Sequence, residues 1–163
     1  MDIANLIIGI VILAFFIVPV LLLSQSGKNK KKKLLKDLET EASIKGIKLT
    51  ESDCWNESAL GFDSSSGTVV FVDESKSERE TSIFNLADVK SFRTIPPMNS
   101  KQDDIADLKK ENRLALEFSF KKPGKSDVVI NFYISGFGKM TEHEQKLFRK
   151  WSILFRDAIQ KTI

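Results

Sequence analysis

Cysteine and histidine are almost absent from this chain of 163 residues, which has only Cys54 and His143. One cysteine excludes an internal disulfide framework and any zinc site that needs several cysteines. One histidine excludes a metal centre built from histidines and a two-histidine proton relay. The composition therefore predicts no cofactor, and it gives no support for an enzyme.

Charge is absent from a long stretch near the start of the chain. Ile3 to Leu23 reads IANLIIGIVILAFFIVPVLLL, which is 21 residues without an ionisable side chain. As a helix it would span about 30 Å, the thickness of the hydrocarbon core of a bilayer. A cleaved signal peptide would need a basic start and a small-residue cleavage site, whereas this chain begins Met1-Asp2. Residues 1–24 are therefore predicted to be an uncleaved transmembrane anchor.

A run of lysines follows the apolar stretch, and it consists of Lys28, Lys30, Lys31, Lys32 and Lys33. Basic residues close to a membrane helix stay on the cytoplasmic side. We therefore expect the N-terminus outside and the rest of the chain in the cytoplasm. The same lysines are candidate contacts with the membrane surface, because each basic residue near anionic lipid contributes about 1 kcal/mol.

The remainder of the chain is nearly neutral. Removing these five lysines from the 25 basic residues, and Asp2 from the 22 acidic ones, leaves 20 basic and 21 acidic side chains in residues 34–163. A nucleic-acid-binding domain would carry a basic stripe across its folded surface. The charge distribution therefore argues against nucleic acid as a partner.

Helices are predicted at both ends of the soluble part. Lys33 to Ser43 places Leu34, Leu35, Leu38 and Ala42 on one helical face, and Gly46 lies just beyond. Near the C-terminus, Thr141 and Glu144 form a capping box. Apolar residues then recur at spacings of three and four: Leu147, Phe148, Trp151, Leu154, Phe155, Ala158 and Ile159.

The region between these helices reads as antiparallel strands joined by short turns. Alternation or β-branched content predicts strands over residues 59–63, 68–72, 81–86, 89–95, 114–121 and 128–134, with a shorter alternating stretch at 47–49. Asp63-Ser64-Ser65-Ser66-Gly67 is a hairpin turn, and Pro96-Pro97 ends strand pairing. Residues 98–112 fit a short helix, a weak strand or a loop.

The predicted fold class is α+β. The transmembrane helix is followed by a strongly bent antiparallel sheet or barrel of about six or seven strands, and a C-terminal amphipathic helix caps it. The chain divides into an anchor (1–24), a basic juxtamembrane segment with a short amphipathic helix (25–46), and one domain (47–163).

Four segments carry a resemblance to the pleckstrin-homology-like superfold: ALGFDSSSGTVVFVD, TSIFNLADVKSFRTI, LALEFSFKKPGKSDVVINFYIS and the helix with Trp151. The pattern covers residues 47–162 and also resembles bacterial single-pass membrane proteins with one such domain. The resemblance implies a bacterial inner membrane location with a cytoplasmic domain. Pleckstrin-homology domains often bind phosphoinositides through basic residues in the loop after the first strand. The corresponding loop would be Asp63 to Gly67, which has no Lys or Arg, so we carry over no ligand residue.

Several short motifs permit a chemical interpretation beside a structural one. Gly136-Phe137-Gly138-Lys139 resembles a phosphate loop but lacks the GxxxxGK[ST] spacing, which favours a turn. Glu142, His143 and Glu144 could act in proton transfer, yet acids in a first helical turn favour capping. Asp103, Asp104 and Asp107 lack the spacing of a calcium loop, which favours a solvated segment.

The cysteine and the two tryptophans are also open to two interpretations. Cys54 has no basic neighbour in sequence that would activate its thiol, which favours a structural role. Trp55 and Trp151 could stack on a ligand, but packing in the core or at the edge of the domain is favoured. No set of residues combines a nucleophile, a base and an orienting group.

These observations predict a non-catalytic interaction module held at a membrane, either a scaffold or an accessory subunit of a membrane complex. Its partners would be membrane lipids, through the anchor, and a cytoplasmic protein, for which exposed strand edges offer a docking route. The alternative is a sensor of anionic lipid that uses the lysine run and the folded domain.

Overall fold

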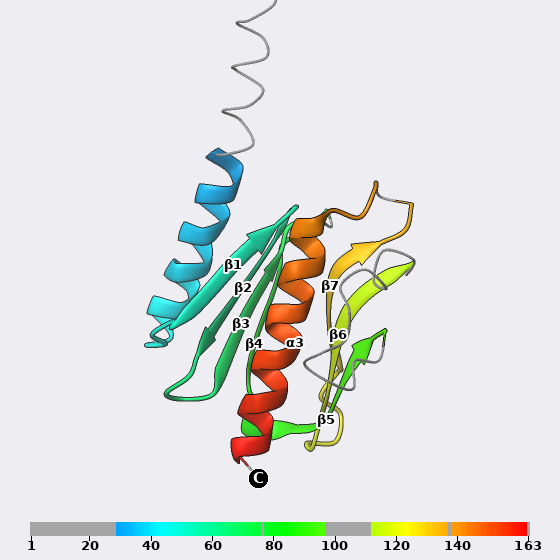
Figure 1. The fold of residues 1–163 in the computed structure, drawn as a ribbon. Coiled ribbons are helices and arrows are strands. Elements are labelled where there is room, and N and C mark those ends of the chain that lie inside the picture. Colours follow the sequence, from blue (N-terminus) through cyan, green and yellow to red (C-terminus); the bar gives the residue numbers. More distant parts are fainter. Residues whose placement is uncertain (1–28, 76, 97–111, 137, 163) are drawn as a thin grey trace, which may run out of the picture.

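The computed structural model describes residues 29–75, 77–96, 112–136 and 138–162. They form an α+β fold in which two antiparallel sheets and two long helices pack together (Figure 1). Residues 29–44 form the first described helix. The elements that follow are β1 (Glu51–Trp55), β2 (Ser58–Asp63), β3 (Thr68–Asp73), β4 (Glu80–Asn85), the 3-10 helix η1 (Leu86–Asp88), β5 (Val89–Ile95), β6 (Arg113–Phe120), β7 (Val128–Ile134) and α3 (Glu142–Thr162).

The coarse fold prediction is confirmed, with one correction. The strands run in the order β1-β2-β3-β4 in one sheet and β5-β6-β7 in the other, each pair antiparallel. Neither sheet closes on itself, so the chain does not form the barrel that was one of the predicted alternatives. The break falls at η1, where the chain leaves β4 and enters the second sheet.

Six of the strands were predicted, and β1 was not. Its sequence, ESDCW, is polar, and only Trp55 is fully buried. An edge strand with one neighbour needs little apolar content, so hydrophobic alternation does not reveal it. The alternating residues 47–49 lie just before β1 and are not in a strand.

The first sheet is buried on both faces over its central strands. All six residues of β2 are buried, as are the middle four of β3. This happens because the helix over residues 29–44 packs on the outer face of the sheet. Its predicted apolar face is confirmed: Leu34, Leu38 and Ala42 are buried against Ala59, Val70 and Val72. The N-terminal helix and the first sheet therefore share one apolar layer, although the boundary predicted at residue 46 lies between them.

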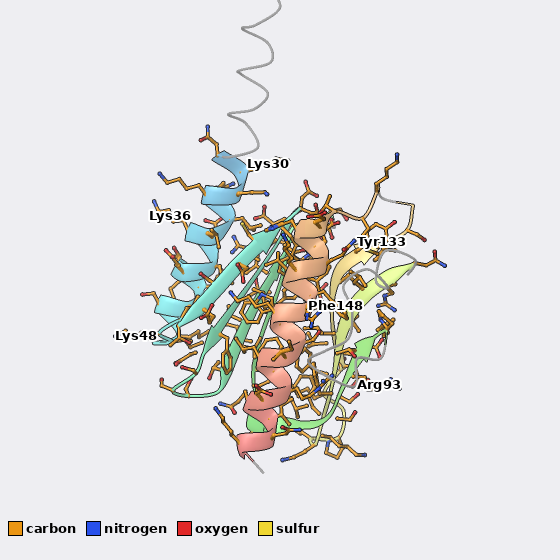
Figure 2. The ribbon with its side chains drawn as sticks, in the orientation of Figure 1. Lys30, Lys36, Lys48, Arg93, Tyr133 and Phe148 are labelled. Carbon is orange, nitrogen blue, oxygen red and sulfur yellow. The ribbon has the colours of Figure 1, made fainter. Side chains whose placement is uncertain are left out.

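The opposite face of the first sheet belongs to the main core. Aromatic residues from both sheets and from α3 fill the space between them (Figure 2). The ring centroids of Trp55 and Phe132 lie 4.3 Å apart, and the Trp55 indole nitrogen donates to the carbonyl of Asn131 at 3.0 Å. Trp55 and Trp151 are at most 1% exposed, which confirms the prediction that both pack in the core.

α3 crosses the open side between the two sheets, as Figure 1 shows. Its predicted capping box is present. The backbone nitrogen of Thr141 donates to Glu144 Oε2 at 2.7 Å, and the backbone nitrogen of Glu144 donates to Thr141 Oγ1 at 3.3 Å. The buried face runs through Leu147, Phe148, Trp151 and Phe155, at the predicted spacing.

The predicted transmembrane anchor (1–24), Lys28, and Asp103, Asp104 and Asp107 lie outside the described residues. So does nearly all of the ambiguous stretch 98–112. Within the described ranges, no helix is long and apolar enough to cross a membrane.

Candidate functional site

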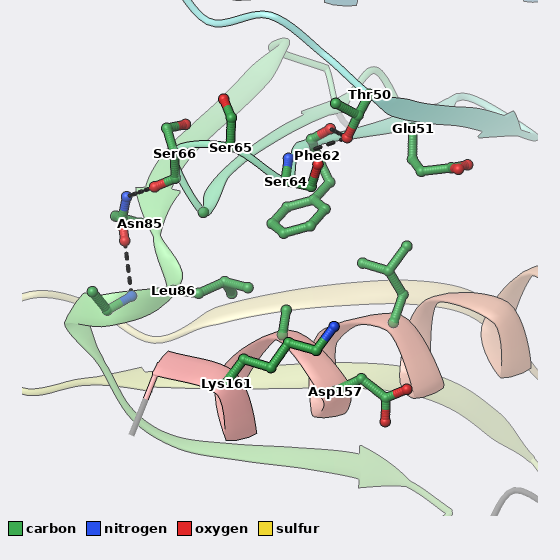
Figure 3. Close-up of a pocket in the computed structure, with 14 residues that line it drawn as sticks. Thr50, Glu51, Phe62, Ser64, Ser65, Ser66, Asn85, Leu86, Asp157 and Lys161 are labelled. Carbon is green, nitrogen blue, oxygen red and sulfur yellow. Dashed lines mark hydrogen bonds between the residues drawn. The ribbon is translucent and has the colours of Figure 1, made fainter.

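An open cleft of about 590 Å³ lies between the turn that joins β2 to β3 and the last turns of α3 (Figure 3). Its walls come from four parts of the chain that are distant in sequence. The residues that line it are Thr50, Glu51, Phe62, Ser64, Ser65, Ser66, Gly67, Asn85, Leu86, Ala87, Leu154, Asp157, Ala158 and Lys161. A volume of this size falls within the range of sites that take small molecules or a few side chains of a protein partner.

Asp63 builds the wall formed by the β2–β3 turn. Its Oδ1 accepts from the backbone nitrogen and the hydroxyl of Ser65 at 2.9 and 2.6 Å, and its Oδ2 accepts from the Ser66 hydroxyl at 2.8 Å. These hydrogen bonds from Ser65 and Ser66 lower the pKa of the Asp63 carboxyl from 3.8 to about 2. The turn is therefore held rigid by its own side chains at neutral pH.

Asn85 joins this turn to η1. Its Nδ2 donates to the carbonyl of Ser66 at 2.6 Å, and its Oδ1 accepts from the backbone nitrogen of Ala87 at 2.8 Å. The turn ends at Gly67, whose φ of +69° suits glycine. Two walls of the cleft are thus tied together by one amide side chain.

The α3 side supplies an apolar surface and a cation. The wall formed by α3 contributes Leu154 and Ala158, and the other walls contribute Phe62 and Leu86. The side chain of Lys161, on the last turn of α3, extends into the space between these walls (Figure 3). The floor is therefore apolar and the rim carries both signs of charge.

The acidic side of the rim is held by α3 as well. Lys150 Nζ lies 2.8 Å from both Glu51 Oε2 and Asp53 Oδ2, and the Trp151 indole nitrogen donates to Asp53 Oδ2 at 3.0 Å. Burial lowers the pKa of the Lys150 ammonium, but the hydrogen bonds to Asp53 and Glu51 outweigh it and raise the pKa. These contacts fasten β1 to α3 beside the cleft.

Most polar groups of the turn are used within the turn itself. The backbone nitrogens of the turn are already used: those of Ser65 and Ser66 by Asp63, and that of Ser64 by Thr50 Oγ1 at 3.1 Å. The hydroxyls of Ser65 and Ser66 donate to the same carboxylate. The described lining includes no histidine or cysteine that could activate a nucleophile.

The lysines predicted to contact a membrane lie elsewhere. Lys30, Lys31, Lys32 and Lys33 are exposed on the first described turns of the N-terminal helix. Figure 2 shows Lys30 at the end of the molecule opposite to the last turn of α3, which lines the cleft. Lys30 Nζ lies 3.4 Å from Glu57 Oε1 in the turn between β1 and β2. Sequence alone did not reveal that a carboxylate of the folded domain reaches this lysine run.

Cys54 is half-buried on β1, and its thiol donates to the carbonyl of Lys31 at 3.9 Å. Burial raises the pKa of the Cys54 thiol, with Lys31 acting in the opposite direction and Asp53 in the same one. A raised pKa means less thiolate, which agrees with the structural role predicted for this cysteine.

The remaining motifs also have structural partners. Glu144 is used by the cap of α3 and accepts from Asn56 Nδ2 at 2.9 Å, while His143 is exposed. Gly136 and Gly138 have φ values of +98° and +126°, as expected of a turn, and Phe137 lies outside the described residues. In the described part of the chain, no group of three or more His, Cys, Asp or Glu residues could hold a metal ion.

Comparisons with known proteins add no family to this description. No protein-family model, no curated protein and no solved structure matches the chain. The sequence patterns did not predict the cleft. Only one of its walls, the turn with the sequence DSSSG, has a recognisable pattern in the sequence.

Proposed function

We propose that this chain is a membrane-held interaction module without catalytic activity, and that the cleft beside α3 is where a cytoplasmic protein docks. The observation that carries the proposal is the combination of an apolar floor, formed by Phe62, Leu86, Leu154 and Ala158, with walls already fixed by hydrogen bonds. Preformed apolar surface lowers the cost of binding, because few groups must be ordered when the partner arrives.

The arrangement of elements supports the pleckstrin-homology-like interpretation of the fold. Four strands in one sheet, three in the other and a C-terminal helix across the open side are consistent with that superfold. With β1 included, the first strand–strand loop is Asn56-Glu57 and not the Asp63–Gly67 turn. That loop also lacks Lys and Arg, which weighs against phosphoinositide recognition there. Many members of this superfold bind proteins.

Site-specific photocrosslinking in the source cells tests the docking site. A photoreactive residue at Ser66, on the rim, should yield a crosslinked protein partner. The same residue at Thr40, which is exposed on the outer side of the N-terminal helix, should not. Filling the cleft with Ala158→Trp should abolish the crosslink at Ser66. An equal pattern of crosslinks at both positions would reject the cleft as the docking site.

Sensing of anionic lipid is the second candidate, because Lys30 to Lys33 are all exposed beside residue 28. Sedimentation with phosphatidylserine liposomes separates the two ideas. The fragment 28–163 should bind if the lysines read lipid, and a variant with Gln at positions 28 and 30–33 should not. Equal binding of the two would place lipid recognition in the folded domain, and no binding of either would reject this function.

A further inference from the structure

The near-neutral domain separates its charges in space, and one end of it is basic. Five exposed lysines gather where the chain passes from β4 to β5, turns from β6 to β7, and finishes α3. These lysines, called here the basic end, are Lys90, Lys121, Lys122, Lys125 and Lys161. Figure 1 shows these three segments at the same end of the molecule. The acids on the same segments are Asp88 and Asp127, and Asp157 lies one turn before Lys161 on α3. Five lysines against these three acids leave an excess of two positive charges.

Contacts within the fold hold two of these ammonium groups beside neutral atoms. Lys121 Nζ donates to the carbonyl of Ala87 at 2.8 Å, and Lys125 Nζ lies 3.9 Å from the centroid of the Phe120 ring. Within the described residues none of the five forms an ion pair, whereas Lys30, Arg79, Arg93, Arg113, Lys146 and Lys150 all do. Among the described residues, no carboxylate therefore neutralises the positive charge at this end by an ion pair.

The basic end is continuous with the cleft. Lys161 and Ala87 both line the cleft, and Ala87 is the residue whose carbonyl holds Lys121. An apolar floor thus lies beside a group of cations. A ligand that fits both would carry an apolar side chain with carboxylates or phosphates on either side of it.

We infer that the basic end and the cleft together bind an acidic segment of a protein, with one apolar side chain seated over Leu154 and Ala158. This inference rests on the proposed function and names the chemistry of its partner. Charges at the rim of an interface steer association and select partners, so lysines placed around an apolar cleft favour acidic segments over neutral ones.

An anionic membrane fits this surface less well. The N-terminal helix begins at the opposite end of the molecule (Figure 1), and α3, with 21 residues, spans about 30 Å between the two ends. The turn of residues 121–127 exposes three lysines but no large apolar side chain that could insert into lipid. Nucleic acid fits poorly as well, because residues 34–163 have no net positive charge.

The test uses the full chain in phosphatidylcholine nanodiscs and fluorescein-labelled peptides. The acidic peptide GEELEEG should bind, and GQQLQQG and GEEGEEG should bind at least about tenfold more weakly. The triple variant Lys121→Glu, Lys122→Glu, Lys161→Glu should also lose at least about tenfold in affinity. The matched variant Lys36→Glu, Lys45→Glu, Lys48→Glu changes three exposed lysines in the N-terminal helix or just after it, and should stay within about twofold.

Binding should weaken when salt is raised about tenfold, because screening shortens the reach of surface charges. Circular dichroism and thermal unfolding confirm that both triple variants are folded. Equal binding of GEELEEG and GQQLQQG, equal losses in the two variants, or no binding at about 1 mM peptide would overturn the inference. Tighter binding to phosphatidylserine vesicles or to a single-stranded oligonucleotide, lost in the Lys121, Lys122 and Lys161 variant, would overturn it too.

The failures of this inference and of the proposed function can be told apart. If the partner crosslinked at Ser66 still binds the Lys121, Lys122 and Lys161 variant, docking in the cleft is retained and the preference for an acidic partner is rejected. If Ala158→Trp changes neither the crosslink nor peptide binding, the cleft itself is not the docking site.

Discussion

The two faces of the first sheet are covered by different kinds of apolar residue. The inner face meets α3 and the second sheet through a core of eighteen buried residues, of which ten are aromatic: Trp55, Phe62, Phe71, Phe84, Phe118, Phe120, Phe132, Phe148, Trp151 and Phe155. The outer face meets the N-terminal helix through six small or aliphatic ones: Leu34, Leu38, Ala42, Ala59, Val70 and Val72. Large rings bury more area and constrain their neighbours more strongly. We therefore expect the inner core to set global stability and the outer layer to hold an element that can detach locally.

The largest effect should come from the inner core. Trp151→Ala removes a fully buried indole that lies 5.2 Å from the Phe155 ring and donates to Asp53. We expect a loss of about 3–5 kcal/mol in the free energy of unfolding, measured by denaturant titration. Ile44→Ala, at a side chain that is 72% exposed, is the control and should change stability by less than about 0.5 kcal/mol.

The corresponding change in the outer layer should be smaller and local. Leu38→Ala empties a fully buried site between the N-terminal helix and the sheet, and should cost about 2–3 kcal/mol. Hydrogen exchange should then accelerate in residues 29–44 much more than in β6. Equal acceleration in both would mean that the two layers unfold as one unit.

Gly61 tests how closely the outer layer is packed. A Cβ added there would lie 2.7 Å from Leu49 Cδ1 and 3.2 Å from Leu38 Cδ2, closer than van der Waals contact allows. Because both atoms are terminal methyl carbons of flexible side chains, Gly61→Ala should lower the free energy of unfolding by only about 1 kcal/mol. Leu49→Ala in the same chain should recover part of that loss in thermal unfolding, which an effect of strand conformation alone would not allow.

Asp63 lies at the turn that joins the two central strands, and it predicts a dependence on pH. Since folding lowers its pKa from 3.8 to about 2, its contribution to stability is present above pH 4 and is lost as the pH falls towards 2. Asp63→Asn should flatten the stability profile between pH 4 and 2. A profile of the same slope in the variant would assign the acid sensitivity to other carboxylates.

The smallest effect is expected at the ion pairs that clip the N-terminal helix to the β3–β4 loop. Arg79 lies 3.6 Å from both Asp37 Oδ2 and Glu41 Oε1, and all three side chains are about a third exposed. Arg79→Met should cost less than about 1 kcal/mol and should become neutral at high salt. A loss as large as that of Leu38→Ala would show that charge, and not apolar packing, holds the helix.

Most of the fold could be predicted from local patterns. The alternation of Leu114, Leu116, Phe118 and Phe120 identified the buried face of β6, although Ala115 is also buried, beside a register shift with β7. The Thr141–Glu144 box identified the start of α3, because capping depends on residues three apart in sequence. β1 could not be predicted in this way, since its polar residues are stabilised by α3 through Lys150 and not by alternation.

The sequence by itself determined the six apolar strands, the two amphipathic helices and the low net charge of residues 34–163, because each depends on neighbouring residues or on composition. Only the tertiary structure decided that the N-terminal helix covers the outer face of the first sheet, and that the sheets remain open. It also decided where charge gathers. Lys121 and Lys161 are 40 positions apart in the chain, and they flank the same short segment because antiparallel pairing and the packing of α3 bring both to η1.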